Sequence, residues 1–371
     1  MFRRSLFAVL CFACGCARSL PARFTAARDA AEAAYAQGDY RGAARHWHDA
    51  TAQAPSPRER NEASYREAAS LERAGDEPGA DAIYAQLERG SGERAERAAY
   101  ARAEMAERRT AKTDALVDLR GAIVRFPNSG LARTAAARYL AREEARSGPT
   151  EALLATERLL ADVRGSELEE TLGYFRAKRL EQLERSDAAR SAYLELATRF
   201  PYPFGAFWDE ALLAAARLDL AAGRPREALQ SLERLLRERE SSHLNGSYER
   251  VGYAEARFLR ARILRDELGD ARAARSEFRR VWNDHPTSRL RDDALFEEAL
   301  TALASGDASA ACAPAKLLTA NEHESRFAGC ASELCPGLKQ AAADCRPYIR
   351  TRIEQARSAA NGSPHSSSSS R

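Results

Sequence analysis

GDYRGAARHWHDATAQAP, residues 38–55, carries the pattern that organises most of this chain. Gly38 is followed five residues later by Ala43 and nine residues later by Trp47, and Pro55 closes the stretch. The glycine, the alanine and a large residue recur at the same spacing further along, which indicates an internal repeat. The equivalent sets are Gly75, Ala80 and Tyr84; Gly223, Ala228 and Leu232; Gly269, Ala274 and Phe278; and Gly306 with Ala311, followed by the small residue Ala315.

The spacing of these glycines gives the length of the repeat. The interval from Gly38 to Gly75 is the same as the interval from Gly269 to Gly306. The interval from Gly223 to Gly269 is longer and corresponds to one period with an insertion. A period of roughly 34 to 40 residues is typical of stacked helical hairpins. We therefore expect an all-α solenoid of αα-hairpins with about eight repeats.

Two repeats in the middle of the chain lack the glycine. The interval from Gly75 to Gly148, and the interval from Gly148 to Gly223, are each about twice the interval from Gly38 to Gly75. Each of these longer intervals therefore corresponds to two repeats. The repeats without a glycine are expected near Thr110 and Glu184. Apart from the glycine, these two repeats should have the same surroundings as the others.

Each repeat can be interpreted from elementary backbone chemistry. The glycine is expected to end a helix, because it adopts a left-handed backbone without a Cβ clash. An aspartate follows directly, and its carboxylate suits the N-terminus of the next helix. The alanine lets two helices approach closely, the large residue fills the space toward the next hairpin, and a proline stops the helix. The aspartates are Asp39, Asp76, Asp270 and Asp307, and the prolines are Pro55, Pro127, Pro201 and Pro286.

Together these positions resemble the tetratricopeptide repeat family, including Pro55 and Pro286, which stand at the same distance from the glycines of their repeats. The match is weakest around Gly148, where Leu153 and Glu157 replace the alanine and the large residue. Another subtype of αα-solenoid is the alternative. The proline-containing loops are similar to those of periplasmic repeat proteins, the BamD-like assembly lipoproteins and the Tol-Pal coordinators. The resemblance implies a scaffold that binds protein segments in a concave groove.

The N-terminus has the layout of an export signal. A basic start at residues 1–4 precedes an apolar run at residues 5–14, which is too short to span a bilayer. Gly15-Cys16 then resembles the lipobox of bacterial lipoproteins. This resemblance implies acylation of Cys16 and, because no aspartate follows directly, anchoring to the outer membrane. Cys14 is a second candidate, and an ordinary signal peptide with incidental cysteines is the alternative.

The remaining four cysteines, Cys312, Cys330, Cys335 and Cys345, all lie close to the C-terminus. Behind an export signal, such a cluster indicates two disulfides that staple a terminal cap. A solenoid needs such a cap to cover its last apolar face. Four cysteines allow three pairings, and we favour Cys312 with Cys330 and Cys335 with Cys345. The rival is a zinc site, but no pair shows the close spacing of structural zinc ligands.

These features divide the chain into five segments. The Ser-rich C-terminus has nothing to bury and should be disordered. The segment from Glu238 to Gly252 accounts for the insertion and is expected to be a loop between helices. The segments are a lipoprotein-type signal peptide (1–15), a tether (16–23), the solenoid (24–326), a Cys-rich helical cap (327–357) and the tail (358–371).

Composition and motifs argue against several functional classes. Aromatic residues are only 8% of the chain and charged residues are 30%, which suits a thin array whose helices each have a wet face. The net charge of +3 is small beside 57 basic and 54 acidic residues, so nucleic-acid binding is not expected. No P-loop, nucleophile-elbow, metalloprotease or dinucleotide-binding motif is present, and we expect no enzyme activity and no cofactor. His46 and His48 point to different sides of a helix, so no metal site is expected there.

One segment stands out as a candidate binding surface. Residues 200–208 contain five aromatic side chains and two prolines, and aromatic surfaces shaped by proline make good anchors for peptides. Tyr202 and Phe204 are the residues that we single out there, although packing between repeats would also explain most of this stretch. The sequence thus predicts a non-catalytic protein-binding scaffold of the cell envelope. The alternative is an accessory protein that binds peptidoglycan or another anionic glycan through Arg-rich faces.

Overall fold

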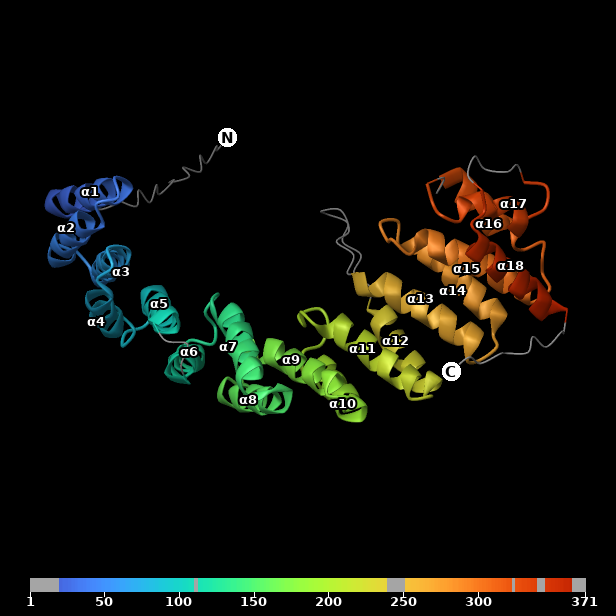
Figure 1. The fold of residues 1–371 in the computed structure, drawn as a ribbon, viewed down its shortest axis with the longest axis horizontal. Helices are drawn as coiled ribbons and strands as arrows, with labels where there is room; N and C mark the ends of the chain where they lie inside the picture. Colours follow the sequence, from blue (N-terminus) through green and yellow to red (C-terminus); the bar gives the residue numbers. More distant parts are fainter. Residues whose placement is uncertain (1–19, 110–112, 239–250, 322–323, 339–343, 362–371) are drawn as a thin grey trace, which may run out of the picture. The chain divides into compact units, whose positions relative to one another are not determined.

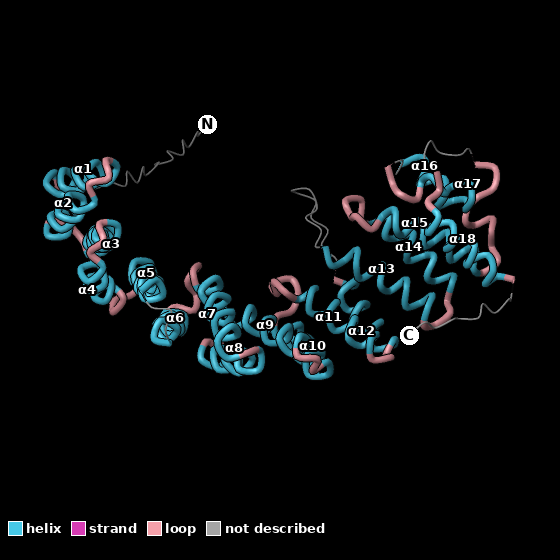
Figure 2. Tube along the Cα trace, in the orientation of Figure 1, coloured by secondary structure: helices cyan, strands magenta, loops and turns pink. Residues whose placement is uncertain are grey.

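The computed structural model describes residues 20–109, 113–238, 251–321, 324–338 and 344–361. Within these ranges every regular element is a helix and none is a strand (Figures 1 and 2). The predicted all-α hairpin solenoid is therefore confirmed. In chain order the helices of the array are α1 (Ala22–Ala36), α2 (Tyr40–Ala52), α3 (Pro57–Arg73), α4 (Glu77–Leu87), α5 (Glu93–Arg109), α6 (Thr113–Arg125), α7 (Ala132–Ser147), α8 (Pro149–Asp162), α9 (Leu168–Gln182), α10 (Ser186–Arg199), α11 (Trp208–Ala221), α12 (Pro225–Arg237), α13 (Val251–Asp266), α14 (Ala271–Asp284), α15 (Arg291–Ala304) and α16 (Cys312–Asn321).

The chain forms two compact units. Unit 1 comprises Met1–Gly148 with Asp162–Leu168, and unit 2 comprises Pro149–Ala161 with Glu169–Arg371. Within unit 1, each helix from α1 to α7 packs on the next one along the chain. Within unit 2, the same holds from α10 to α16. Each unit is thus a stack in which contacts are made between sequence neighbours, as in repeat proteins. No helix in the described part of the chain is both long and apolar enough to cross a membrane.

The turn between the two helices of a repeat forms as predicted. Gly75 ends the first helix with φ +82°, and Gly269 does so with φ +68°. The aspartate that follows caps the second helix: Asp39 Oδ1 accepts a hydrogen bond from the Gly42 amide at 2.8 Å, and Asp270 Oδ1 accepts one from the Ala273 amide at 2.9 Å. These bonds satisfy backbone donors that the first turn of a helix leaves without a partner.

The alanine and the large residue of the signature are buried in every repeat that carries them. The buried alanines are Ala43, Ala80, Ala228, Ala274 and Ala311, and the buried large residues are Trp47, Tyr84, Leu232 and Phe278. Two of the large residues meet an aromatic side chain of the first helix: the ring centroids of Tyr65 and Tyr84 are 5.5 Å apart, and those of Phe258 and Phe278 are 5.3 Å apart. Each such burial contributes about 1.5–3 kcal/mol in transfer free energy.

The repeat near Glu184 keeps the turn geometry without a glycine. Glu184 lies between α9 and α10 and has φ +58°, the left-handed conformation that glycine adopts in the other repeats. Ala189 and Tyr193 follow at the signature spacing and are buried. The Tyr193 hydroxyl donates to Glu181 Oε2 at 2.8 Å, and burial raises the pKa of Tyr193. Thr110, where the other glycine-free repeat was expected, lies outside the described residues.

The Gly148 repeat departs from the signature in the way its sequence suggested. Gly148 ends α7 with φ +87°, and Leu153 is buried at the alanine position. Glu157, at the position of the large residue, is partly exposed and accepts a hydrogen bond from Arg176 Nε at 3.0 Å. An ion pair therefore replaces the usual aromatic packing. Pro55, Pro127, Pro201 and Pro286 all lie in loops directly after helices, as predicted.

The C-terminal cap is held by two disulfides, and our preferred pairing of its cysteines is wrong. The structure joins Cys312 to Cys335 and Cys330 to Cys345, with Cα–Cα distances of 4.7 and 4.5 Å. The reason is the path of the chain between Cys330 and Cys335, which η1 (Ala328–Cys330) and α17 (Ala331–Leu334) turn. This turn brings Cys335 against Cys312 at the start of α16 and leaves Cys330 beside Cys345, just before the last helix. All four sulfurs are paired, so no thiolate is left for zinc.

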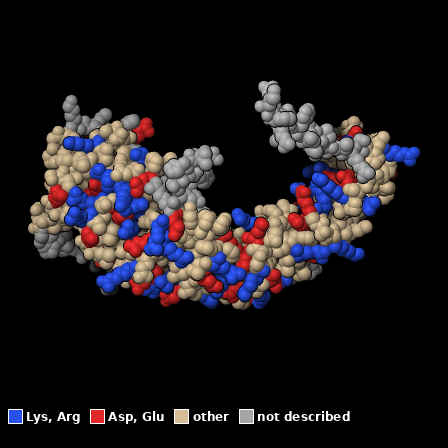
Figure 3. Space-filling model, turned by 180° about the vertical axis from the view of Figure 1, so that it is seen from behind, with Lys and Arg blue, Asp and Glu red and all other residues tan. Residues whose placement is uncertain are grey.

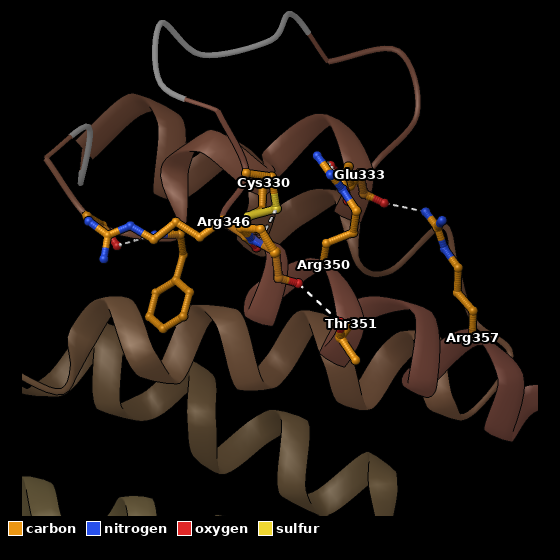
Figure 4. Close-up of a disulfide and its surroundings, with 10 residues drawn as sticks. Cys330, Glu333, Arg346, Arg350, Thr351 and Arg357 are labelled. Atoms are coloured by element: carbon orange, nitrogen blue, oxygen red, sulfur yellow. Dashed lines mark hydrogen bonds and ion pairs between the residues drawn. A yellow bond between two sulfur atoms is a disulfide. The ribbon is translucent and has the colours of Figure 1, made fainter. Parts of the chain in front are cut away.

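The last helix, α18 (Pro347–Ala360), packs on α15 and covers the end of the array. Ile349 and Ile353 of α18 are fully buried. Figure 4 shows that Arg350 and Arg357, both on α18, reach Glu333 of α17; Arg350 Nε donates to Glu333 Oε1 at 2.9 Å. The helix continues to Ala360, so it extends into the first three residues assigned to the tail.

Four predicted segments fall partly or wholly on residues that the structure does not describe, and α1, which begins at Ala22, takes in the last two residues assigned to the tether (16–23). The signal peptide and Cys16 lie outside the described ranges, as do residues 362–371 of the tail. In the predicted insertion, α12 ends at Arg237 and α13 begins at Val251, while residues 239–250 lie outside the described ranges.

Glu184→Gly should stabilise unit 2. A left-handed backbone costs a residue with a Cβ about 1–2 kcal/mol, and the greater freedom of glycine in the unfolded chain offsets part of this gain. We expect a net gain of about 0.5–1 kcal/mol, visible as a higher midpoint in urea denaturation followed by circular dichroism. Gln182→Gly, at the last residue of α9, is the control and should lower the midpoint. An equal or lower midpoint for Glu184→Gly would contradict the left-handed assignment.

The disulfide pairing can be read by digesting the unreduced protein with trypsin and a Glu-specific protease. Cleavage after Glu333 separates Cys330 from Cys335, because it places them in residues 327–333 and 334–339. We expect mass spectrometry to find residues 327–333 linked to the peptide that contains Cys345, and residues 334–339 linked to the one that contains Cys312. Linkage of residues 327–333 to the Cys312 peptide would support the pairing that the structure rejects.

Candidate functional site

Unit 1 carries a groove of about 740 Å³ along its first helices. Its walls come from α1, α3 and the start of α5, and its floor includes Trp47 of α2. The first helices of three successive hairpins thus line it, while the second helix of the first hairpin closes it from below. A smaller hollow of about 160 Å³ shares Glu32, Trp47 and Arg66 with the groove and extends it along α1 and α3 to Tyr35 and Ser70.

The floor of the groove is apolar. Phe24, Trp47 and Ala63 line it and belong to one buried cluster with Ala43 and Ala31. Trp47 therefore has two roles: it packs between hairpins, as the repeat signature predicted, and it lines the groove. An apolar floor beneath polar walls is the usual construction of a binding site for an organic or peptide ligand.

The walls of the groove carry charges of both signs at helical spacing. On α1 and α3 the charged positions recur every four residues, which places them on one face of each helix. The lining contains four arginines and four glutamates: Arg28, Arg58, Arg66 and Arg94, with Glu32, Glu59, Glu62 and Glu93. A ligand with alternating or mixed polarity would match this wall better than a polyanion would.

Several of these charges are held in place before any ligand binds. Glu62 accepts a hydrogen bond from Arg66 Nε at 2.9 Å and also pairs with Arg94, which links α3 to α5. The Arg94 guanidinium lies 5.2 Å from the centroid of the Tyr65 ring. At the start of α3, the hydrogen bond from the Ser56 hydroxyl lowers the pKa of Glu59.

Other polar groups of the groove have no such partner. The side chains of Glu32, Arg58 and Asn61 form no hydrogen bond or ion pair with any residue that the structure describes. A carboxylate, a guanidinium and an amide can together donate to and accept from the main chain and side chains of a peptide. These three residues are therefore the ones in the groove most free to respond to a ligand.

The aromatic segment predicted as a binding surface lies in unit 2, in the loop between α10 and α11. The structure separates the two residues that the sequence grouped together. Tyr202 packs on Trp208, with ring centroids 5.6 Å apart, and is part of the core surface. Phe204 has 92% of its surface exposed. Packing thus explains Tyr202, while Phe204 makes no comparable contact.

The groove residues were not identified from the sequence, apart from Trp47. The repeat signature draws attention to residues that pack between helices, and these are the wrong residues for recognising a ligand. A usable signal was the four-residue spacing of charges on α1 and α3, in the helix that precedes each signature glycine. That signal does not say which face of a helix is concave, because the stacking of several hairpins decides it.

The described residues form neither a cluster of metal ligands nor, on the face shown in Figure 3, a continuous basic surface for a polyanion. No group of three or more His, Cys, Asp and Glu side chains within them could hold a metal ion. His48 Nδ1 lies 3.0 Å from Glu67 Oε1 and so forms an ordinary surface pair. On the face shown in Figure 3, acidic and basic side chains are interspersed and neither sign forms a continuous block.

Comparison with known families identifies one repeat directly. Residues 255–288 match the family model described as tetratricopeptide repeat. The matched residues include α14, most of α13 and the signature residues Gly269, Ala274 and Phe278. The chain therefore contains a tetratricopeptide repeat in unit 2. No curated protein matches the sequence.

Solved structures with some similarity include two tetratricopeptide repeat proteins and RapI. A tetratricopeptide repeat protein from Parabacteroides merdae is 14% identical over 74% of this chain and 98% of that chain, with a TM-score of 0.31. The C-terminal part of a repeat protein from Cytophaga hutchinsonii is 13% identical over 71% and 98%, with a TM-score of 0.39. The apo form of RapI is 10% identical over 91% and 98%, with a TM-score of 0.41. Similarity this low says nothing about function.

Proposed function

We propose that this protein is a non-catalytic scaffold that binds segments of other proteins in the groove of unit 1. The observation that carries the proposal is the groove itself: an apolar floor at Phe24 and Trp47 below walls with fixed ion pairs and three unpartnered polar side chains. A preformed site of this kind orders little of itself on binding, so more of the contact energy becomes affinity. Peptide segments supply both the apolar anchors and the main-chain polar groups that such a surface needs.

The groove favours a protein segment over the anionic glycan that was the alternative. Its four arginines are matched by four glutamates, and two of the arginines already pair with Glu62. A polyanion would meet repulsion from the glutamates and would have to compete for those arginines. A peptide can instead place a base beside Glu32 and a carboxylate or carbonyl beside Arg58.

We further propose that the scaffold acts at the bacterial cell envelope, exported and anchored to the outer membrane through Cys16, in the assembly or coordination of an envelope complex. The support is the layout of residues 1–16 and the two disulfides of the cap, since disulfides persist in oxidising compartments. Acyl chains on one cysteine would tether the array without a membrane-spanning helix, because each buried CH₂ contributes about 0.8 kcal/mol.

The double variant Arg58→Glu with Asn61→Ala tests the groove. Neither side chain forms a hydrogen bond or an ion pair with the described residues, so the fold should keep its thermal midpoint. Peptides selected from a displayed random library on the wild-type protein should bind the variant at least about tenfold more weakly by fluorescence anisotropy, a loss of about 1.4 kcal/mol. Arg73→Glu with Gln86→Ala, in the same unit but outside the groove lining, is the matched control. Equal affinity for all three proteins would refute the groove as the site.

Cys16→Ser tests the anchor. In a bacterium that processes lipoproteins, the wild-type protein should be labelled by a fatty-acid probe and should sediment with membranes. Cys16→Ser should lose the label and move to the soluble fraction, because acylation requires the thiol. Cys14→Ser, two residues earlier, is the control and should behave like the wild type. If only Cys14→Ser moved the protein to the soluble fraction, Cys14 would be the acylated residue. If neither variant did so, the proposed lipid anchor would be wrong.

A further inference from the structure

The smaller hollow beside the groove of unit 1 has the size of a single side chain. Its volume of about 160 Å³ corresponds to about five water molecules, at about 30 Å³ each in the liquid. Ala36 and Ala69 contribute apolar walls, and Glu32, Trp47 and Arg66 line both the hollow and the groove. A segment that lies in the groove can therefore extend one side chain into this hollow.

Most charges of the groove are already used within the protein. Of the eight charged side chains in its lining, six have a partner: Arg28 pairs with Asp29, Glu59 with Ser56, Glu62 with both Arg66 and Arg94, and Glu93 with Arg97. Glu32 and Arg58 form no hydrogen bond or ion pair with any residue that the structure describes. One free carboxylate and one free guanidinium thus remain for a ligand.

The two free charges lie at different levels of the groove. The starts of α1 and α3 line the groove together and their ends line the hollow together, so these two helices run in the same direction. Arg58 lies at the start of α3, whereas Glu32 lines the hollow together with Arg66. The eight residues of α3 from Arg58 to Arg66 rise by about 12 Å along the helix axis. The free carboxylate is therefore about 12 Å further along the groove than the free guanidinium.

The hollow matches the side chain of lysine. Its apolar walls suit a stem of four CH₂ groups, and the Glu32 carboxylate suits the ammonium group at the end of that stem. Tyr35 and Trp47 also line the hollow, and aromatic rings attract cations. The Ser70 hydroxyl donates to the Arg66 carbonyl at 2.8 Å and keeps lone pairs that can accept from an ammonium group. Lysine has five non-hydrogen side-chain atoms, in keeping with the volume, whereas arginine has seven.

The distance between the free charges sets the spacing of residues in the ligand. In an extended chain each residue rises about 3.3 Å, and alternate side chains point to the same face. A span of about 12 Å is therefore about four residues, so that residues i, i+2 and i+4 face the groove together. The middle one of these three lies over the apolar floor at Phe24 and Trp47.

We propose, on the basis of the function proposed above for the groove, that its ligand is an extended protein segment with a lysine that enters the hollow beside Glu32. An aspartate or glutamate four residues from this lysine pairs with Arg58, and the residue midway between them is apolar. The spacing is the same for either direction of the bound chain. Glu32 then determines specificity, because the apolar floor alone would accept many segments and a buried carboxylate contact accepts few.

Peptides selected from a displayed random library on the wild-type protein give the first test. We expect the tightest binders to contain a lysine four residues from an aspartate or glutamate, with an apolar residue midway. A set of binders without this lysine would overturn the proposal. So would charges seven or eight residues apart, which is the spacing that a helical ligand needs in order to span about 12 Å.

A double-mutant cycle then tests the contact with Glu32. Replacing the lysine of a selected peptide by norleucine keeps the stem and removes the charge, and it should weaken binding to the wild type at least tenfold by fluorescence anisotropy. The same replacement should change the affinity for Glu32→Gln less than threefold, because the carboxylate that the ammonium group meets is gone. Glu104→Gln, which removes a carboxylate of α5 outside both linings, is the matched control and should respond like the wild type.

The outcomes distinguish a wrong ligand from a wrong site. If no peptide binds, or if all of them bind Arg58→Glu with Asn61→Ala as tightly as the wild type, the groove is not the site. If peptides bind in the groove but norleucine weakens binding to the wild type and to Glu32→Gln equally, the groove stands and the lysine contact is refuted. Thermal midpoints of Glu32→Gln and Glu104→Gln should equal that of the wild type, which excludes unfolding as the cause of any loss.

Discussion

The close contact made by one buried alanine sets the geometry of every hairpin that carries the full signature. Ala43, Ala80, Ala228 and Ala274 are all fully buried at the point where the second helix of a hairpin meets its neighbours. A larger side chain there would push the helices apart, and such overpacking typically costs about 1–3 kcal/mol. The rest of the repeat follows from this contact: the left-handed turn and the aspartate cap aim the second helix, and the large residue one turn later fills the space that the alanine leaves.

At the C-terminal end of the array, the apolar face of the last hairpin must be covered, and a cap that two disulfides hold covers it. Beyond α15 and α16 the described chain provides no further hairpin as an apolar partner, and it instead lays α18 across α15. Phe327 of the cap stacks on Phe296 of α15 at 4.2 Å, and Glu297 binds both Arg352 of α18 and Arg265 of α13. The buried residues of the cap join one core cluster with α15 and α16. Two disulfides restrict its unfolded conformations and so help such a small element to stay folded.

The sequence was sufficient for features set by local chemistry and insufficient for those set by packing between distant residues. The turns at Gly75 and Gly269 and the caps at Asp39 and Asp270 depend on a few neighbouring residues, so their pattern could be recognised. The glycine-free repeat at Glu184 could be located by its period, but its left-handed backbone could not be, because glutamate disfavours it and the surrounding contacts impose it. The disulfide pairing depends on how far η1 and α17 rotate the chain, which the spacings of the cysteines do not specify.

The same reasoning explains why Tyr202 and Phe204 could not be told apart beforehand. Both are aromatic, both lie beside a proline, and either could have packed on Trp208. Only the folded loop shows which ring is used internally, and that use is what leaves Phe204 outside. The repeat signature is therefore informative about function mainly by exclusion: Tyr84, Leu232 and Phe278 are fully buried in the stacking of hairpins, whereas Trp47 also lines the groove.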